Sequence, residues 1–393
     1  MAATGESSHT VRPSSADEVV EALRAAGAEG RRVRARGAGT KLGWGRPTEE
    51  PEVDLDLSGL DRVLEHNEGD LTAVLEAGAP LGRAQAQFAE AGQMLALDPS
   101  LGPGEAATAG GVFATGDSGP LRHRYGGGRD VIIGIGVAMS DGMSARAGGK
   151  VIKNVAGYDL AKLFTGSFGT LGVILDVVVR LHPLDPALAT ARGRADDPNR
   201  LAAAASRLAH ARMETMAVDV AWSGGEGHVL ARFGGQTAAD QARAGVELLS
   251  DGAGVDADVV EDDASLWQAQ RDGQRAGEGG AVVRVSSVQA ELPRVLRAAE
   301  RAGAAVVGRA GLGLSWLRLG PRSDAAEMTA PIEALRADLA PAPCVVQDAP
   351  AEVRAALDPW HEPEGPGLVL MRRVKARFDP AGVCNPGVYV GGI

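Results

Sequence analysis

Cysteine is scarce in this chain, and that scarcity limits the cofactors that the chain can hold. The 393 residues include two cysteines, Cys344 and Cys384. We therefore expect no disulfide framework, and two thiolates are fewer than the four that usually hold an iron–sulfur cluster, so we expect none within this chain. The seven histidines include no pair at the spacing of metal ligands in the second half of the chain. The sequence thus predicts no metal site.

The sequence also lacks a long apolar run and an excess of positive charge. No apolar run reaches the length of about 18 residues that a membrane span needs, and residues 1–9 are polar, unlike a signal peptide. The formal net charge is −11, and no basic stripe offsets it, which argues against nucleic acid as a partner. We expect a cytoplasmic protein. Peripheral attachment to the inner face of a membrane, through partner proteins, stays open as an alternative.

Glycine, by contrast, is abundant, and it concentrates in three segments. The chain has 54 glycines, about twice the usual share of roughly 7%. The segments are RGAGTKLG at 36–43, TAGG at 108–111 with SG at 118–119, and GSFGTLGVI at 166–174. The first follows a predicted strand at 32–36, and the third leads into a predicted strand at 173–181. Such loops can direct backbone amides at a pyrophosphate, and residues without a Cβ let the backbone approach a flat ligand.

The first segment is neither of two common phosphate-binding motifs. It has no Gly-Lys-Ser/Thr at the spacing of a P-loop, and no Gly-x-Gly-x-x-Gly that opens a long helix. Taken alone, a flexible turn explains this segment equally well, and close helix packing does the same for the second. The case for a ligand depends on the three segments together, in their order and spacing.

In that order and spacing, the three segments resemble the flavin-binding segments of the FAD-linked oxidase family, which shares the p-cresol methylhydroxylase (PCMH) or vanillyl-alcohol oxidase fold. Within that family the chain looks most like the FAD-binding subunits of bacterial glycolate oxidases. The resemblance covers about residues 13–183 and 368–388. It implies an α+β fold with a PCMH-type FAD-binding domain of two α/β subdomains at 1–185. A cap domain at 186–365 and a C-terminal segment at 366–393, which returns to the FAD-binding domain, complete the expected organisation.

Local patterns add the elements expected in each part. In the first part, Ser15 and Glu18 have the spacing of a capping box, which predicts a helix that ends at Gly27. Further strands are expected at 53–57, 61–66, 71–77, 130–139 and 143–146, with helices at 80–91 and 158–164. In the cap, strands at 217–222, 227–233, 281–286, 304–307, 314–319 and 344–347 alternate with helices at 237–249, 290–302 and 325–339. This rhythm predicts an α+β cap, with an antiparallel sheet covered on one side by helices.

The resemblance also implies which residues contact FAD. The residues expected to hold the pyrophosphate are Arg36, Gly37, Ala38, Gly39 and Thr40. Those expected to line the flavin and its phosphates are Pro99, Gly110, Gly111, Thr115, Ser118, Gly119 and Asp130. Backbone contacts are expected from Gly169, Thr170, Gly172, Val173 and Ile174. For Lys153, Asn154 and Tyr158, ordering of the cofactor wall and plain structural packing are equally good explanations. The first two segments carry no histidine or cysteine before His123, so FAD should be held without a covalent bond.

The reaction that the resemblance implies is oxidation of a small 2-hydroxyacid such as glycolate. This chemistry needs a base, a cation for the carboxylate and a flavin that accepts hydride. The catalytic residues stay unassigned. His361 and Arg372 are the candidates, and Arg373 and Lys375 beside Arg372 could equally be solvated helix charges.

By the same resemblance, the chain would be the FAD-binding subunit of a glycolate oxidase (glycolate dehydrogenase) complex. It would work with a second flavoprotein subunit and with an iron–sulfur subunit that takes the electrons onward. Two alternatives stay open. The chain could be a stand-alone FAD-linked oxidase or dehydrogenase of another hydroxyacid or alcohol. It could also be a structural subunit that binds FAD without catalysis.

Overall fold

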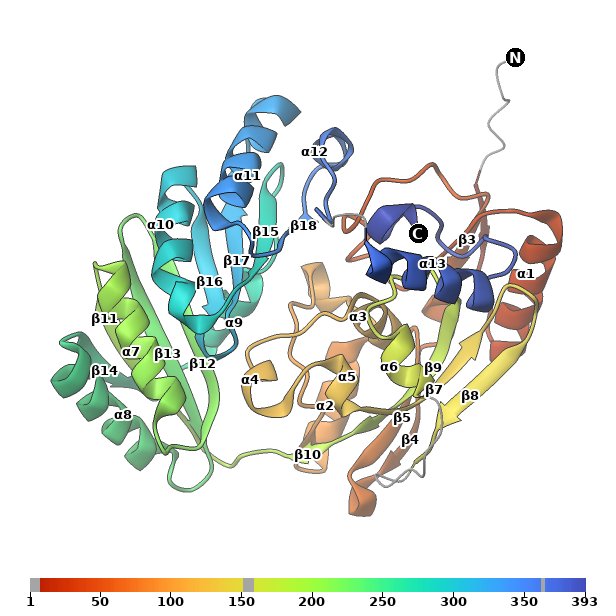
Figure 1. Cartoon of the computed structure of the whole chain (residues 1–393). Coiled ribbons are helices and arrows are strands. Elements are labelled where there is room, and N and C mark those ends of the chain that lie inside the picture. Colours follow the sequence, from red (N-terminus) through yellow and green to blue (C-terminus); the bar gives the residue numbers. More distant parts are fainter. Residues whose placement is uncertain (1–7, 151–158, 362–364) are drawn as a thin grey trace.

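The computed structural model describes residues 8–150, 159–361 and 365–393 (Figure 1). The N-terminal region holds two sheets. A parallel sheet has the order β1 (His9–Val11), β3 (Val53–Asp56) and β2 (Val33–Arg36). An antiparallel sheet has the order β4 (Val63–Asn67), β5 (Thr72–Glu76), β9 (Val173–Arg180), β7 (Ile132–Ala138) and β8 (Ser144–Gly148). A short pair joins β6 (Gln93–Met94) to β10 (His182–Pro183).

Helices pack around these two sheets and share one apolar core with them. They are α1 (Ala16–Glu29), α2 (Leu81–Glu90), α3 (Ala109–Thr115), α5 (Gly128–Val131) and α6 (Leu160–Phe164). Helix α4 (Arg122–Tyr125) lies outside this core, and its Tyr125 packs in a smaller cluster with Leu121 and Met216. The strand predicted at 173–181 forms the centre of the five-stranded sheet, and seven of its eight residues are buried. An apolar run of this kind fits a strand that neighbours cover on both faces.

Helix α1 differs from its prediction at both ends. The Ser15 side chain accepts from the Glu18 amide at 3.3 Å as expected, but the Glu18 carboxylate reaches back to the Ser14 amide at 2.7 Å. The helix continues past Gly27 to Glu29 and ends at Gly30, which has a φ of 67°. Gly27 serves close packing instead, because a Cβ there would lie 2.0 Å from the Ser140 carbonyl oxygen. The helix ends where the left-handed backbone favours glycine.

The second region is built on one eight-stranded antiparallel sheet, which we call the large sheet. Its strand order is β14 (Asp256–Val260), β11 (Leu188–Ala195), β13 (Glu226–Gly234), β12 (Thr215–Ser223), β16 (Ala305–Arg309), β17 (Leu314–Leu319), β15 (Ala281–Ser286) and β18 (Cys344–Asp348). One face is covered by α7 (Pro198–His210), α8 (Ala238–Ala253), α10 (Leu292–Ala302) and α11 (Ala325–Leu339) (Figure 1). Helix α9 (Ala264–Asp272) packs on the other face, where Trp267 contacts Ala217 and Leu230. The mixture of helices and antiparallel sheets confirms the α+β class.

The C-terminal part of the chain crosses back to the N-terminal region. After α12 (Ala351–Ala356), helix α13 (Pro366–Phe378) lies against that region, and Phe378 meets Phe164 of α6 with ring centroids 5.6 Å apart. The following segment pairs with β2, because the Val33 amide donates to the Val383 carbonyl and the Asn385 amide donates to the Val33 carbonyl, both at 2.8 Å. This return brings Asn385 to the loop that follows β2.

Candidate flavin and substrate site

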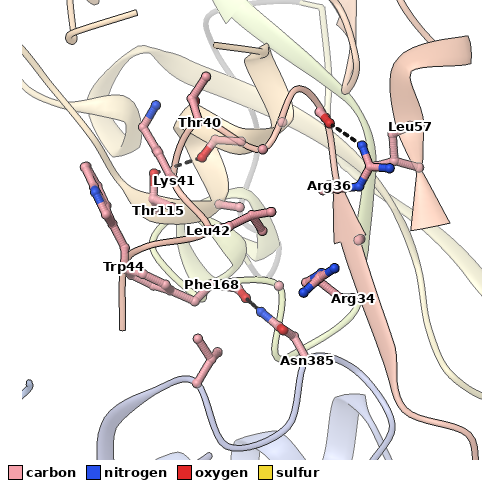
Figure 2. A pocket seen from close by; sticks show the side chains of 18 of the residues that line it. Arg34, Arg36, Thr40, Lys41, Leu42, Trp44, Leu57, Thr115, Phe168 and Asn385 are labelled. Carbon is pink, nitrogen blue, oxygen red and sulfur yellow. Dashed lines mark hydrogen bonds between the residues drawn. The ribbon is translucent and has the colours of Figure 1, made fainter. Parts of the chain in front are cut away.

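The three glycine-rich segments meet around one cavity of about 300 Å³ (Figure 2). The first segment leaves β2, the second forms α3, and the third enters β9. The lining also includes residues from outside the three segments, among them Arg34, Trp44, Ala77, Arg354 and Asn385. Asn385 ties the C-terminal segment to this wall by donating from Nδ2 to the Phe168 carbonyl at 2.7 Å.

Glycine is required where these segments approach one another. A Cβ at position 37 would lie 2.2 Å from the Thr108 hydroxyl oxygen, so only glycine lets the first loop pack against the start of α3. Gly169 has a φ of +70°, and a Cβ there would meet nothing within 4 Å. The third segment therefore uses glycine to turn in the left-handed region while leaving its cavity side open.

The guanidinium of Arg36 has partners within the protein. Its Nε donates to the Asp54 carboxylate at 2.6 Å, and Asp56 lies 3.5 Å from Nη2. The hydrogen bond to Asp54 raises the pKa of Arg36. Arg36 thus lines the cavity as part of an ion-pair cluster beneath the glycine loop. The backbone amides of that loop are then the groups that suit a pyrophosphate.

A second cavity, of about 290 Å³, adjoins the first and shares Trp44, Thr115 and Phe168 with it. It lies between the N-terminal region and the large sheet, because its lining includes both Arg122 of α4 and Arg284 of β15. Strand β18 adds the run 345–347 to the same wall. This second cavity therefore opens onto both halves of the chain.

Positive charge dominates the polar lining of the second cavity. Three arginines line it, Arg122, Arg129 and Arg284, against one carboxylate, Asp130. Burial lowers the pKa of Arg284, and the neighbouring Arg122 lowers it further. Burial also lowers the pKa of Arg122. Since a guanidinium fork matches a carboxylate, this cavity suits a small organic acid.

An aromatic cluster forms the apolar side of the second cavity. Phe168 meets Trp360 edge to face at 4.9 Å and stacks on Tyr389 at 5.4 Å between ring centroids. The Trp360 indole nitrogen donates to the Val388 carbonyl at 3.0 Å, which fixes the ring. A rigid aromatic wall beside arginines limits water around a bound acid and strengthens the charge interactions there.

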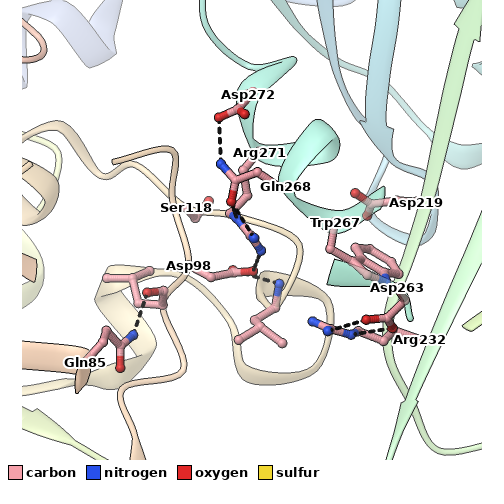
Figure 3. A network of polar contacts seen from close by, with 12 residues as sticks. Gln85, Asp98, Ser118, Asp219, Arg232, Asp263, Trp267, Gln268, Arg271 and Asp272 are labelled. Atoms are coloured by element: carbon pink, nitrogen blue, oxygen red, sulfur yellow. Dashed lines mark hydrogen bonds and ion pairs between the residues drawn. The ribbon is translucent and has the colours of Figure 1, made fainter. Parts of the chain in front are cut away.

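A network of polar contacts fastens α9 to the segment that carries Thr115 (Figure 3). Asp98 accepts from the Leu121 amide at 2.9 Å and lies 3.7 Å from the Arg271 guanidinium. The Gln274 side chain donates to the Ser118 carbonyl at 3.1 Å. Burial raises the pKa of Asp98 to about 6. The large-sheet region thus helps to position a segment that lines both cavities.

The structure brings most of the predicted cofactor residues together. The first cavity is lined by Arg36, Gly37, Ala38, Gly39, Thr40, Gly110, Gly111, Thr115, Gly169, Gly172, Val173 and Ile174. Asp130 lines the second cavity and accepts from the Gly127 amide at 2.8 Å. Four predicted residues line neither cavity, namely Pro99, Ser118, Gly119 and Thr170. Gly119 instead packs so closely on the Asp98 carbonyl that a Cβ would lie 1.7 Å from its oxygen.

The candidate catalytic residues of the C-terminal part do not reach either cavity. His361 is exposed, and exposed Arg372 donates to the Gly391 carbonyl at 3.3 Å. Lys375 is a structural residue, because its ammonium donates to the Thr170 and Cys384 carbonyls and to the Asp379 carboxylate. The predicted wall residues Lys153, Asn154 and Tyr158 lie outside the described residues.

Sequence reasoning missed the residues that give the second cavity its character. Arg284, Trp360 and Tyr389 are far apart in the sequence and become neighbours only when β15, β18 and the C-terminal segment assemble. Lys41 and Trp44 could have been found, since Lys41 stands inside the first glycine-rich segment and Trp44 directly follows it. Over the described ranges, no cluster of three or more metal-ligating side chains occurs, and no helix is long and apolar enough to cross a membrane.

The two cavities fit FAD by their donor chemistry. Buried nitrogen atoms without a protein acceptor occur at Lys41 and Trp44 in the first cavity lining and at Arg284 in the second. A dinucleotide rich in phosphate and carbonyl oxygens supplies the acceptors that such donors lack. In the third segment, a Cβ added at Gly169 would meet nothing within 4 Å, so open space remains in the first cavity beside these donors. The residues present therefore match the cofactor that the resemblance implied.

Comparison with known proteins gives the same result. The family described as "FAD binding domain" matches residues 7–148, and the family described as "FAD linked oxidases, C-terminal domain" matches residues 361–389. An uncharacterised FAD-linked oxidoreductase of Mycobacterium tuberculosis is 30% identical over 98% of this chain and 91% of its own length.

Other relatives match less than half of the chain. The glycolate oxidase subunit GlcE of Escherichia coli is 36% identical over 38% of this chain and 41% of its own length. The D-lactate dehydrogenase of Archaeoglobus fulgidus is 35% identical over 44% of this chain and 38% of its own length. A solved alkyldihydroxyacetonephosphate synthase shares the fold, with a TM-score of 0.72 and 17% identity over 96% of this chain and 75% of its own. The chain belongs to the FAD-linked oxidoreductases, with a PCMH-type FAD-binding fold and FAD as its cofactor.

Proposed function

We propose that the chain is the FAD-binding subunit of a glycolate oxidase (glycolate dehydrogenase) complex. The observation that carries this proposal is the arginine-lined second cavity beside the cofactor cavity. The relationship to glycolate oxidase subunits over about two fifths of the chain supports it. In this account FAD is bound without a covalent link, because the described lining residues of both cavities include no histidine or cysteine.

The protein residues bind and orient the substrate in this proposal. Arg284 and Arg122, which line the second cavity, bind the carboxylate of a 2-hydroxyacid beside the wall that the two cavities share. Thr115 and Phe168 belong to that shared wall. When bound, FAD supplies the acceptor for the hydride that such an oxidation removes. The aromatic cluster keeps the acid in a low-dielectric environment, where its interaction with the guanidinium groups is strong.

The electrons then leave through a partner subunit. The chain has two cysteines, fewer than the usual four cluster ligands, and its described residues hold no cluster of three metal-ligating side chains. The proposal therefore places the iron–sulfur cluster on a separate chain, together with a second flavoprotein subunit. Attachment to the inner face of a membrane would then come from those partners.

Two observations favour a second candidate function. The relative that matches along nearly the whole chain is an uncharacterised FAD-linked oxidoreductase, whereas the glycolate oxidase subunits match less than half of this chain. Three arginines are also more positive charge than one small monocarboxylate needs. A dehydrogenase of a larger or doubly charged 2-hydroxyacid, active without partners, is therefore the alternative.

Anaerobic titration of the FAD-loaded chain separates these functions. Glycolate, D-lactate and D-2-hydroxyglutarate are added in turn, and the visible flavin bands are followed with and without the co-expressed partner subunits. Bleaching by glycolate that needs the partners supports the complex, whereas bleaching of the isolated chain by a larger acid supports the alternative. Flavin bands that no 2-hydroxyacid changes, with partners or without, would overturn both.

The same titration tests the role of the arginines. Arg284→Gln should weaken binding of the acid by about 10- to 150-fold, since a charge-assisted hydrogen bond contributes about 1.5–3 kcal/mol. Arg318→Gln is the matched control, because Arg318 is an exposed arginine on the neighbouring strand β17 and lies outside the second cavity. Equal affinities of the two variants for the acid would show that the second cavity does not bind it.

A further inference from the structure

Lys41 and Trp44 carry buried donors at the junction of the two cavities, and among the described residues the Lys41 ammonium has one long ion pair while the Trp44 indole nitrogen has no acceptor. The Trp44 side chain is 4% exposed, and its indole nitrogen has no acceptor. The Lys41 side chain is 6% exposed, and its ammonium lies 3.5 Å from the Asp117 carboxylate, beyond the usual hydrogen-bond distance. Trp44 lines both cavities and Lys41 lines the first (Figure 2).

A residue of the large-sheet region holds this pair in place. The Arg275 guanidinium lies over the Trp44 ring at 5.2 Å from its centroid, and the Lys41 ammonium lies over the same ring at 5.7 Å. Arg275 also donates to the Thr40 carbonyl in the glycine loop and pairs with Asp348 of β18 at 3.3 Å. One nitrogen of this guanidinium, Nη1, is likewise buried without an acceptor. The two halves of the chain therefore meet around the Trp44 indole.

The charges at the junction are not balanced within the protein. Lys41 and Arg275 face Asp117 and Asp348, while Arg284 adds a further cation within electrostatic reach of Asp117. Burial lowers the pKa of Lys41, and Arg275 lowers it further against the opposing effect of Asp117. A buried ammonium with one long contact lowers the stability of the fold unless another acceptor forms a hydrogen bond with it. The cluster thus suits a negatively polarised group with exposed acceptor atoms.

We propose that Lys41 and Trp44 are an unassigned part of the cofactor site, and that both donate to acceptor atoms of FAD at the junction of the cavities. Arg275 makes this part of the site depend on the large-sheet region. Two parts of FAD offer such acceptors, the pyrophosphate oxygens and the ring carbonyl oxygens. This role of Lys41 and Trp44 in FAD binding does not depend on which substrate the protein oxidises.

The test is the affinity of the apo-protein for FAD and for ADP, measured by calorimetry on the full chain. Trp44→Phe keeps an aromatic ring for the two cations and removes only the indole donor. Lys41→Met is combined with Asp117→Asn, so that no unpaired buried carboxylate is left behind. Trp222→Phe is the matched control, since the Trp222 indole nitrogen is also buried without an acceptor but lies in the core of the large sheet.

Both test variants should weaken FAD binding by about tenfold or more, the effect of losing one hydrogen bond to a charged or polarised group. Trp222→Phe should stay within about twofold of the parent protein. An equal loss for ADP identifies the pyrophosphate as the bound group, and unchanged ADP affinity identifies the flavin ring. Test variants that are folded by circular dichroism and bind FAD like the parent protein would overturn the proposal. If the chain oxidised no 2-hydroxyacid, the proposed function would fail, but the measured FAD affinities would still test the role of Lys41 and Trp44.

Discussion

Filling the first cavity from Gly169 should abolish FAD binding while leaving the fold intact. Gly169 lines that cavity, and a Cβ at this position would meet no other atom within 4 Å. A large side chain therefore has room to enter the space that the cofactor needs. Gly169→Trp tests this directly. Gly169→Ala is its matched control, because both variants put a Cβ on a backbone with a φ of +70°.

The expected magnitudes separate backbone strain from loss of the cofactor. A non-glycine residue in the left-handed region costs about 1–2 kcal/mol, so both variants should lose that much free energy of unfolding without FAD. At FAD concentrations of about 100 times Kd, bound cofactor adds about 2.7 kcal/mol to the parent protein. Gly169→Ala should keep that increment and Gly169→Trp should lose it. With FAD, the tryptophan variant should then lie about 4 kcal/mol below the parent protein.

Urea unfolding with and without FAD measures these differences, and the visible spectrum after gel filtration reports the flavin that stays bound. A Gly169→Trp protein that retains FAD and gains the full increment of stability would refute the reasoning, since the cofactor would then lie elsewhere. Loss of FAD from both variants would show that the loop conformation, and not the open space, decides binding.

Three further predictions concern the framework of the site. Lys375→Met should lower the free energy of unfolding by about 3–5 kcal/mol, because it leaves the buried Asp379 carboxylate without its cation; urea unfolding measures this, and a loss below about 1 kcal/mol would contradict it. Burial raises the pKa of Asp219 to about 7 from 3.8 although Arg309 lies 2.7 Å away, so the folded state favours the protonated acid. The protonated Asp219 side chain therefore adds to the free energy of unfolding below about pH 4, and this addition is lost as the pH rises to 7. Asp219→Asn should therefore be less destabilising at pH 8 than at pH 5, and an equal difference in unfolding free energy at both pH values would count against this. Gly172→Ala should cost about 1–3 kcal/mol and weaken FAD binding, because its Cβ would lie 2.5 Å from a carbonyl oxygen of β7; unchanged stability in the same assay would show that β9 can shift freely.

The sequence predicted the large sheet well where local signals were strong. The strands at 281–286 and 314–319 and the helix at 325–339 have the bounds that the structure shows. Each has a clear apolar period and a marked end. Strand β11 and helix α7 were missed, because they follow closely on a proline-rich stretch that reads as irregular structure. The domain boundaries at 185 and 365 stay predictions.

The cofactor cavity was predictable and the second cavity was not, for one physical reason. The first cavity is built from continuous loops, so the glycines of 36–40 and 166–174, and the order of these segments, can be recognised directly in the sequence. The second cavity depends on long-range pairing, which places Arg284 opposite Arg122 across two regions of the chain. Ser118 belongs to a glycine-rich segment, yet its carbonyl accepts a hydrogen bond from the Gln274 side chain, and this contact joins the two regions.

The most direct test of the account is whether the purified chain takes up FAD in a site that responds to a carboxylate. The chain is incubated with FAD and freed of excess cofactor, and its visible spectrum is recorded before and after oxalate is added as an acid that cannot be oxidised to a ketoacid. The account predicts bound flavin whose bands shift with oxalate, and a shift that Arg284→Gln weakens while Arg318→Gln does not. A colourless protein that retains no FAD would contradict the account at its centre.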